Sequence, residues 1–366
     1  MVTWWHFLII CILAFAVTVA AVPLVRRIAI RFDIVDQPGP RRVNKEPIPR
    51  MGGVAMFAGL IVAFAVEFAL DALGVWEGPL VRNGVVNSQV VGLIVALCFI
   101  VAVGVLDDAF SLRPIVKFAG QIIACCIIAG TGTLLARFHL PFSDAIVSFD
   151  ILAYPITVIY LVAFINIINL IDGLDGLAAG VTGIASATLF VLMLTLARLD
   201  AALIALMLVG VCAAFLIYNF NPASIFMGDS GSMMLGLMLG TVSLLGAARF
   251  ASVTIMIVPI VIALVPIIDT FGAIVRRVRG HESIAHADAG HIHHRLLKRG
   301  FSQRKAVLMI YAWTALLSVG ALLIWEVGGV VKYAVFVVLL VASAIIVWKL
   351  GLFAPVRHHV DGPDDE

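Results

Sequence analysis

The chain carries little charge and few cysteines for its length. Only 13% of its 366 residues are Asp, Glu, Lys or Arg, and 63% are hydrophobic, whereas soluble domains carry about 25% charged residues. This composition excludes soluble domains, disordered segments, collagen-like chains and coiled coils. We therefore expect an all-α polytopic integral membrane protein.

The cysteines and the net charge exclude further classes of protein. All five cysteines lie within apolar stretches without metal-ligand spacing, and Cys125 directly precedes Cys126. Adjacent cysteines are too constrained to suggest a structural disulfide, so we expect all five to be buried small hydrophobic residues. The net charge of +2 is too small to indicate a nucleic-acid partner.

Apolar stretches long enough to cross a bilayer recur along the chain. A hydrocarbon core of roughly 30 Å requires about 20 apolar residues per helix. Eleven stretches are of about this length: 4–25, 52–73, 89–106, 115–135, 152–171, 177–197, 201–218, 231–247, 251–274, 306–325 and 333–350. We predict one transmembrane helical domain over residues 1–350 and a polar cytoplasmic tail over 351–366.

The basic residues predict the orientation of these helices. Nineteen of the 24 Lys and Arg residues fall on one side, mainly in the loops 26–51 and 275–305. Cytoplasmic loops carry such an excess, so we expect the N-terminus outside and the C-terminus inside. Three polar junctions, 107–114, 166–176 and 219–230, also fall on the cytoplasmic side, which is where we expect the chemistry.

Acidic residues mark all three junctions. Asp107 and Asp108 end the third stretch, where a carboxylate pair could bind a cation, share a proton, or simply reach water at a helix end. The second junction, NIINLIDGLDG, contains Asn166, Asn169, Asp172 and Asp175 at spacings of three. Its oxygen atoms suit a hard cation, most simply Mg²⁺, or could cap helices.

The third junction and the two long loops complete the set. Asp229, in NPASIFMGDSG, is expected at the start of a helix, as a metal ligand or as an N-cap. The loop 276–305 contains five histidines, which could bind zinc, face anionic lipid, or hold phosphate together with Arg295 and Lys298. The first loop, with Lys45, could hold a lipid phosphate or face lipid head groups.

Acidic and basic side chains are expected together at one membrane face. This combination is typical of phosphoryl transfer between a soluble diphosphate and a membrane-held phosphate. An ion-coupled secondary transporter is the alternative, but its acids are expected near the bilayer midplane in repeated halves. Glu67, Asp71 and Asp269 lie within or near apolar stretches and leave ion passage open. We interpret Asp269, two helical turns from Arg276, as structural.

Four segments together resemble one enzyme family. LDDAFSLRPIVKFAGQ, NIINLIDGLDGLAAG, NPASIFMGDSG and HIHHRLLKRGFSQRKAV occur in that order, as in the polyprenyl-phosphate N-acetylhexosamine-1-phosphate transferases. The run His291 to Arg295 resembles the N-acetylglucosamine branch (the WecA and TagO type) rather than the peptidoglycan branch (the MraY type), which is the nearest alternative. The chain departs from the family at Asn44, where members often have His.

The resemblance implies a reaction and its participants. N-acetylglucosamine 1-phosphate is transferred from UDP-N-acetylglucosamine to undecaprenyl or decaprenyl phosphate, UMP is released, and Mg²⁺, or Mn²⁺ in its place, is required. The setting is the bacterial cytoplasmic membrane, with the active site facing the cytoplasm, and a homodimer is suggested. The implied roles are catalysis by Asp107, Asp108 and His293, metal binding by Asp229 and Asp172, and substrate binding by Lys117, Asn169, Asp175, Asn219, His294, Arg295 and Lys45.

Overall fold

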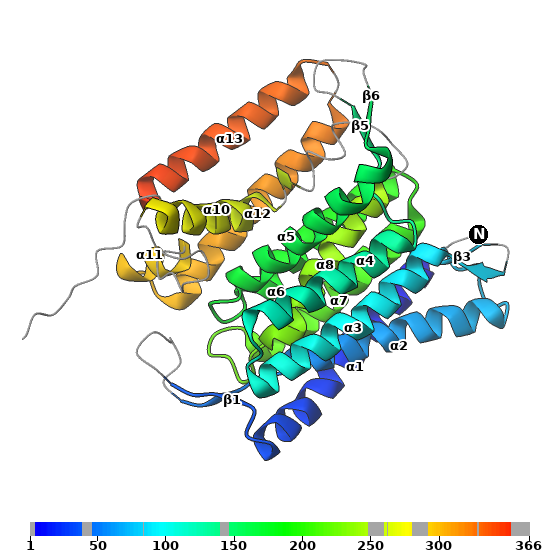
Figure 1. Cartoon of the computed structure of the whole chain (residues 1–366), viewed down its shortest axis with the longest axis horizontal. Coiled ribbons are helices and arrows are strands. Elements are labelled where there is room, and N and C mark those ends of the chain that lie inside the picture. Colours follow the sequence, from blue (N-terminus) through cyan, green and yellow to red (C-terminus); the bar gives the residue numbers. More distant parts are fainter. Residues whose placement is uncertain are drawn as a thin grey trace, which may run out of the picture.

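The computed structural model describes residues 4–38, 46–82, 84–139, 146–247, 260–261, 263–279, 292–327 and 329–352. Figure 1 shows a bundle of long helices with three short strand pairs at its ends. The helices are α1 (Trp4–Arg31), α2 (Gly52–Ala72), α3 (Ser88–Phe110), α4 (Pro114–Gly130), α5 (Ala153–Ile171), α6 (Leu177–Thr195), α7 (Leu199–Asn219), α8 (Gly228–Ala247), α10 (Leu264–Arg279), α11 (Ile292–Lys298), α12 (Gln303–Glu326) and α13 (Val331–Leu350).

Three antiparallel strand pairs connect the helices. They are β1 (Val35–Asp36) with β2 (Ile48–Pro49), β3 (Val81–Arg82) with β4 (Val85–Val86), and β5 (Arg137–His139) with β6 (Ile146–Ser148). In Figure 1, β1 and α11 lie at one end of the bundle, whereas the N-terminus, β3 and β5 lie at the other. Loops expected on opposite sides of the membrane therefore lie at opposite ends of the molecule.

The fold class is confirmed. In the described residues, eight helices are long and apolar enough to cross a membrane, and α4 is a shorter apolar helix. Helices form here because a chain in lipid must satisfy its backbone groups internally. Each expected stretch matches a helix, with ends that differ by up to six residues, except 251–274, which lies partly outside the described residues. The total of eleven spans and the orientation stay predictions.

The helix α8 forms the centre of the bundle. It packs against α2, α3, α5, α6 and α7, and its residues from Ser230 to Gly246 are all buried. Small residues permit this close approach, because a Cβ on Gly236 would lie 2.6 Å from the Ile165 Cα. The first turn of α8 is therefore held from several sides, and it carries Asp229.

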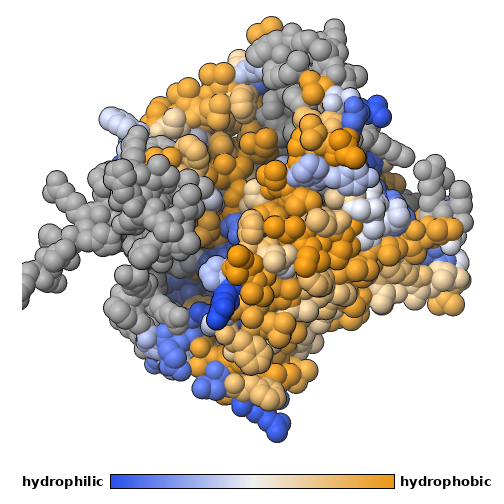
Figure 2. Space-filling view, in the orientation of Figure 1, coloured by the Kyte–Doolittle hydropathy of each residue, from blue (hydrophilic) through white to orange (hydrophobic). Residues whose placement is uncertain are grey.

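Part of the cysteine prediction is wrong. All five cysteines are free, and Cys125 and Cys212 are buried, but Cys98 and Cys126 are exposed. The helices α3 and α4 present these two side chains on the outside of the bundle. Figure 2 shows hydrophobic side chains over most of the visible surface of the helices, so a small apolar residue is suited to this position as well as to the core.

A buried ionisable pair joins α1 to α2. His6 Nε2 lies 2.5 Å from Glu67 Oε2, and both side chains are fully buried. The Trp76 ring packs against His6 with 4.3 Å between centroids. Glu67 was one of the acids that kept an ion-transporting function possible from the sequence. In the structure it has a buried partner, His6.

We expect Glu67→Ala to destabilise the protein by roughly 3 kcal/mol, because removal of one partner leaves a buried polar group uncompensated. Glu67→Gln keeps an acceptor for His6 and should unfold closer to wild type. Thermal unfolding in detergent measures both variants. Equal midpoints for Glu67→Ala and wild type would contradict a stabilising role of this pair.

Candidate active site

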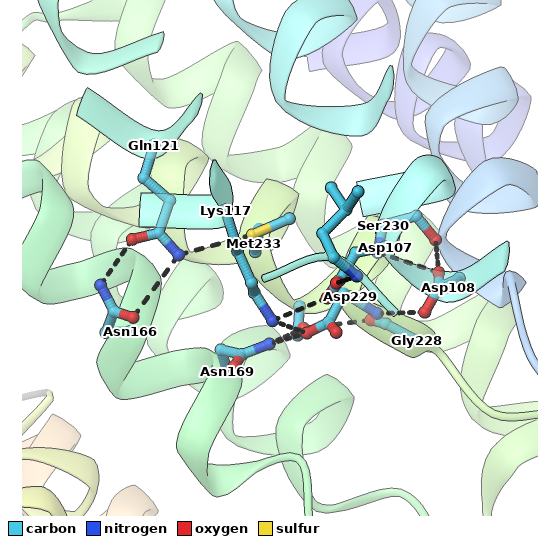
Figure 3. Close-up of polar contacts among 12 residues, drawn as sticks. Asp107, Asp108, Lys117, Gln121, Asn166, Asn169, Gly228, Asp229, Ser230 and Met233 are labelled. Carbon is cyan, nitrogen blue, oxygen red and sulfur yellow. Dashed lines mark hydrogen bonds and ion pairs between the residues drawn. The ribbon is translucent and has the colours of Figure 1, made fainter. Parts of the chain in front are cut away.

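Asp108 on α3 caps the N-terminus of α8. Its Oδ1 accepts a hydrogen bond from the Asp229 backbone N–H at 2.8 Å, and its Oδ2 accepts from the Ser230 N–H at 3.1 Å and from the Ser230 hydroxyl at 2.8 Å. These contacts are drawn in Figure 3. The interpretation of Asp229 as its own helix cap is therefore wrong, because a residue from another helix supplies the cap.

The carboxylate pair does not simply reach water. Asp107 is 8% exposed and Asp108 is 7% exposed. Asp107 Oδ1 accepts from the Leu112 backbone N–H at 2.8 Å, while Asp107 Oδ2 faces Lys117. Both acids are therefore held inside the protein by specific contacts.

We expect Asp108→Ala to lower the unfolding free energy by about 2 kcal/mol, since three hydrogen bonds at a helix N-terminus are lost. Transfer activity should fall with it because the first turn of α8 carries Asp229. Asp108→Asn retains one of the two acceptor oxygens, whereas its NH2 group cannot accept, so this variant should recover only part of the stability. If Asp108→Ala unfolds like wild type, the capping contacts do not stabilise the protein.

Lys117 bridges two carboxylates from different helices. Its Nζ lies 3.0 Å from Asp107 Oδ2 and 2.6 Å from Asp229 Oδ1, with 20% of its side chain exposed. Pro114 stands at the start of α4, where its fixed φ favours helix initiation, and this places Lys117 in the first turn. The cation offsets the negative charge of the two acids at the point where α3, α4 and α8 meet.

The amides of α5 complete this network. Asn169 Nδ2 donates to Asp229 Oδ1 and, at 2.8 Å, to the Ser232 hydroxyl. One turn earlier, Asn166 Nδ2 donates to Gln121 Oε1 at 2.8 Å. Asn166 and Asn169 therefore lie within α5 and bind α4 and α8 across the bundle (Figure 3), so the capping interpretation of these two residues is wrong.

A cavity of about 770 Å³ opens beside this network. In Figure 2, hydrophilic side chains gather in a hollow near the β1 end of the molecule. The charged and amide side chains on the cavity wall are Arg26, Asp36, Glu46, Arg50, Asn169, Asp172, Asp175, Asn219, Asn221, Asp229 and Gln303. Two of the acidic junctions, 166–176 and 219–230, therefore line one cavity. The third lies beside them, because Asp108 accepts from the Asp229 N–H.

Asp172 carries a carboxylate that no other described residue hydrogen-bonds. Burial, followed by the neighbouring Asp229 and Asp108 carboxylates, raises the pKa of Asp172 to about 7. Excess negative charge next to free carboxylate oxygens is the environment that a hard cation stabilises. Asp172 and Asp229, both on the cavity wall, fit a Mg²⁺ site.

The cavity offers a metal ion few protein ligands. Among the described residues, no three His, Cys, Asp or Glu side chains form a metal-binding group. Mg²⁺ needs no such group, because it commonly takes one or two carboxylates and completes its shell with water and substrate phosphates. The metal site stays a prediction.

Asp175 and Asn219 use their polar atoms within the protein. Asp175 Oδ2 accepts from Asn221 Nδ2 at 2.8 Å and from the Ala223 N–H at 3.1 Å. Asn219 Oδ1 accepts from the Gly176 N–H, and its Nδ2 donates to the Ile225 carbonyl, both at 2.9 Å. Both residues hold the junctions 173–176 and 219–225 together at the cavity wall, and their predicted substrate contacts stay predictions.

The basic loops are less completely described. Lys45 lies outside the described residues, as do the side chains of His293 and His294. Arg295, on α11, is not among the described residues that line the cavity. Asp269 Oδ1 accepts from the Ile292 N–H at 2.7 Å, which joins α10 to α11 and agrees with its interpretation as structural.

The structure adds residues that the sequence alone did not single out as site residues. Arg50, Asn221 and Gln303 line the cavity, and Ser232 contacts Asn169. Ser232 lies three residues after Asp229, and this helical spacing was the available signal. Gln303 had no such signal, because only folding brings the start of α12 to Asn221, whose Nδ2 donates to Gln303 Oε1 at 2.8 Å.

Comparisons with known proteins show which family the chain resembles. Residues 90–247 match the family model described as glycosyl transferase family 4. The chain is similar to a probable undecaprenyl-phosphate N-acetylglucosaminyl 1-phosphate transferase of Bacillus subtilis, with 35% identity over 93% of this chain and 92% of the relative.

Two further relatives span the branches of this group. A decaprenyl-phosphate N-acetylglucosaminephosphotransferase of Mycolicibacterium smegmatis is 36% identical over 83% of this chain and 79% of its own length. A phospho-N-acetylmuramoyl-pentapeptide-transferase of Desulforamulus reducens is 29% identical over 82% of this chain and 89% of its own. With its buried acids at the junction of α3, α5 and α8 and with this similarity along nearly its whole length, the chain belongs to glycosyl transferase family 4.

Proposed function

We propose that this protein transfers N-acetylglucosamine 1-phosphate from UDP-N-acetylglucosamine to a polyprenyl phosphate and releases UMP. The observation that carries this proposal is the cavity lined by Asp172, Asp229 and Asn169 at one end of a membrane bundle, with Lys117 bound to Asp229 behind its wall. The printed names of the Bacillus and Mycolicibacterium relatives support the donor sugar and the acceptor class.

The proposed reaction is a single displacement at phosphorus. An oxygen of the lipid phosphate attacks the phosphorus that carries the sugar, and the bond from this phosphorus to the UMP oxygen breaks. A phosphomonoester has a second pKa of about 6, so the acceptor is already ionised near neutral pH. We therefore favour direct attack over an aspartyl intermediate, which would need a second displacement.

The residues of the chain mainly position and balance charge. Asp172 and Asp229 would hold Mg²⁺, which when bound neutralises charge on the donor diphosphate and the leaving UMP. Lys117 compensates Asp107 and Asp229 before substrate binds. Asn169 and Ser232 orient the Asp229 carboxylate through hydrogen bonds. The chemistry then depends on arrangement rather than on a strong base.

The setting follows from the same proposal. Arg26 and Arg50, which belong to a loop rich in basic residues, line the cavity, and cytoplasmic loops carry an excess of Lys and Arg. UDP-sugars are soluble donors, so a cavity open to the cytoplasm suits them. We propose a bacterial cytoplasmic-membrane enzyme with its active site at the cytoplasmic face, assembled as a homodimer.

An assay with purified protein in detergent tests this function. Undecaprenyl phosphate, Mg²⁺ and UDP-N-acetylglucosamine are supplied, and UMP and lipid-linked sugar are measured, with UDP-N-acetylmuramoyl-pentapeptide in a parallel reaction. We expect product with the first donor and none after chelation of the metal. Product with the second donor alone would place the protein in the peptidoglycan branch, and folded protein inactive with both would refute the proposal.

A further inference from the structure

Cationic groups are scarce on the wall of the cavity. Of the described residues that line it, Arg26 and Arg50 are cationic, whereas five are acidic. Lys117 is bound to Asp107 and Asp229 and does not line it. Both substrates of the proposed reaction carry phosphate, so a phosphate-binding cation on this wall is expected beyond any metal ion.

Arg50 has a firmly held backbone next to the acidic site. Its N–H donates to the Ile34 carbonyl at 3.1 Å, and the carbonyl of the preceding Pro49 accepts from the Phe226 N–H at 2.8 Å. Two residues later, the Gly52 N–H donates to the Phe226 carbonyl at 2.9 Å. Arg50 is therefore fixed to the segment that leads directly into Asp229.

The close packing of the same segment leaves it little freedom to move. A Cβ on Gly53 would lie 2.0 Å from the Gly231 backbone nitrogen, so the start of α2 touches the first turn of α8. Arg50 and Asp229 thus belong to one packed unit, although 179 positions separate them in the sequence.

Asp36 orients the Arg50 side chain but occupies only part of its hydrogen-bond donors. One guanidinium nitrogen donates to Asp36 Oδ1, and the Arg50 side chain is 30% exposed whereas that of Asp36 is 7% exposed. A guanidinium has five N–H donors, so donors remain for a ligand. Arg50 also lines the same cavity as Asp172 and Asp229.

Arg26 is the weaker candidate for the same role. Its Nε donates to the Ser224 carbonyl at 3.2 Å, and this contact is exposed. A cation in open water is strongly screened and contributes little to binding. Arg50 combines a fixed backbone, a buried acidic partner and access to the cavity.

We propose that Arg50 binds a substrate phosphate and that Asp36 orients its guanidinium for this contact. The inference rests on the proposed function, since it assumes phosphate-bearing substrates in this cavity. A guanidinium can bind two phosphate oxygens at once, which a lysine ammonium cannot do in the same geometry. The phosphate belongs either to the donor diphosphate or to the lipid acceptor.

Steady-state kinetics of Arg50→Gln, Arg50→Lys and Asp36→Asn test the assignment. We expect Arg50→Gln to raise the KM of one substrate about tenfold or more, and Arg50→Lys to give an intermediate value. Titration of UDP-N-acetylglucosamine at fixed lipid phosphate, and the reverse, shows which substrate is affected. Asp36→Asn should raise that KM much less than Arg50→Gln, because Arg50 keeps its donors.

A merely structural ion pair gives a different pattern. In that case Arg50→Gln and Asp36→Asn should be equally impaired, and Arg50→Lys, which can still pair with Asp36, should keep the wild-type KM. Either of these two results would overturn the proposal, as would unchanged KM values for both substrates in Arg50→Gln. Thermal unfolding midpoints identify any variant that fails to fold. The KM values of the Arg50 variants that do fold then distinguish a phosphate ligand from a structural ion pair.

Direct binding separates this inference from the proposed function. Calorimetry with inorganic pyrophosphate in detergent measures phosphate affinity without turnover. If wild-type protein binds pyrophosphate and Arg50→Gln does not, Arg50 is a phosphate ligand even when UDP-N-acetylglucosamine is not turned over. Equal pyrophosphate affinity in both proteins would refute the role of Arg50 while leaving the transfer reaction intact.

Discussion

Replacement of Asp229 by Asn should reduce sugar-phosphate transfer by at least about a hundredfold while leaving the protein folded. Loss of one preorganised charged contact in an active site costs about this much. The Asn side chain has the same shape and retains an oxygen that can accept from Asn169. The expected loss therefore reports the missing charge rather than a change in packing.

The structure explains why this position should be so sensitive. Asp229 contacts Lys117 at 2.6 Å, receives a hydrogen bond from Asn169, and has its backbone N–H held by Asp108 at 2.8 Å. Residues from three other helices thus hold Asp229 at the wall of the cavity, two through its carboxylate and one through its backbone. Such convergence on a single acid is expected where the acid must hold a metal ion and a substrate in register.

UMP release and the unfolding midpoint measured on the same preparation check this expectation. Asp71→Asn is a matched control, because Asp71 Oδ1 accepts from the Gly78 N–H at 2.6 Å and an Asn oxygen can do the same. The control should retain transfer within about twofold. Near-normal transfer by Asp229→Asn would remove Asp229 from the metal site and would also weaken the assignment of Asp172.

Lys117→Met should impair both folding and transfer. The change leaves Asp107 and Asp229 facing each other without the cation that lies 3.0 Å and 2.6 Å from them. Removal of one partner from a fully buried ion pair costs about 3–5 kcal/mol. Because Lys117 is 20% exposed, we expect a smaller loss of about 2 kcal/mol.

The effect on transfer should exceed the effect on stability. Unpaired carboxylates repel the incoming phosphates, so activity is expected to fall about a hundredfold or more. Lys117→Arg keeps the charge and should retain more activity than Lys117→Met, although its larger head does not match the same position. Unfolding in detergent and steady-state kinetics measure the two effects, and a fully active Lys117→Met would show that the ammonium has no part in the reaction.

The helical segments could be predicted closely because lipid imposes a simple rule. A spanning segment must be apolar and must satisfy its own backbone, so length and composition alone locate α2, α5 and α6 within a few residues. The burial of individual side chains did not follow from this rule. In lipid, both the core and the outer surface are apolar, which is why Cys98 could not be distinguished from Cys125.

The sequence by itself determined the membrane class, the helix positions and the acids that mark the site, because unusual polar residues in an apolar chain have few other uses. Only the tertiary structure decided what each acid does. Asp108 caps α8, and Lys117 neutralises Asp107 and Asp229. Arg50 lines the cavity, and backbone hydrogen bonds from its neighbours to Phe226 hold it there. These roles arise from the packing of helices far apart in sequence, and spacing along the chain carries no information about such contacts.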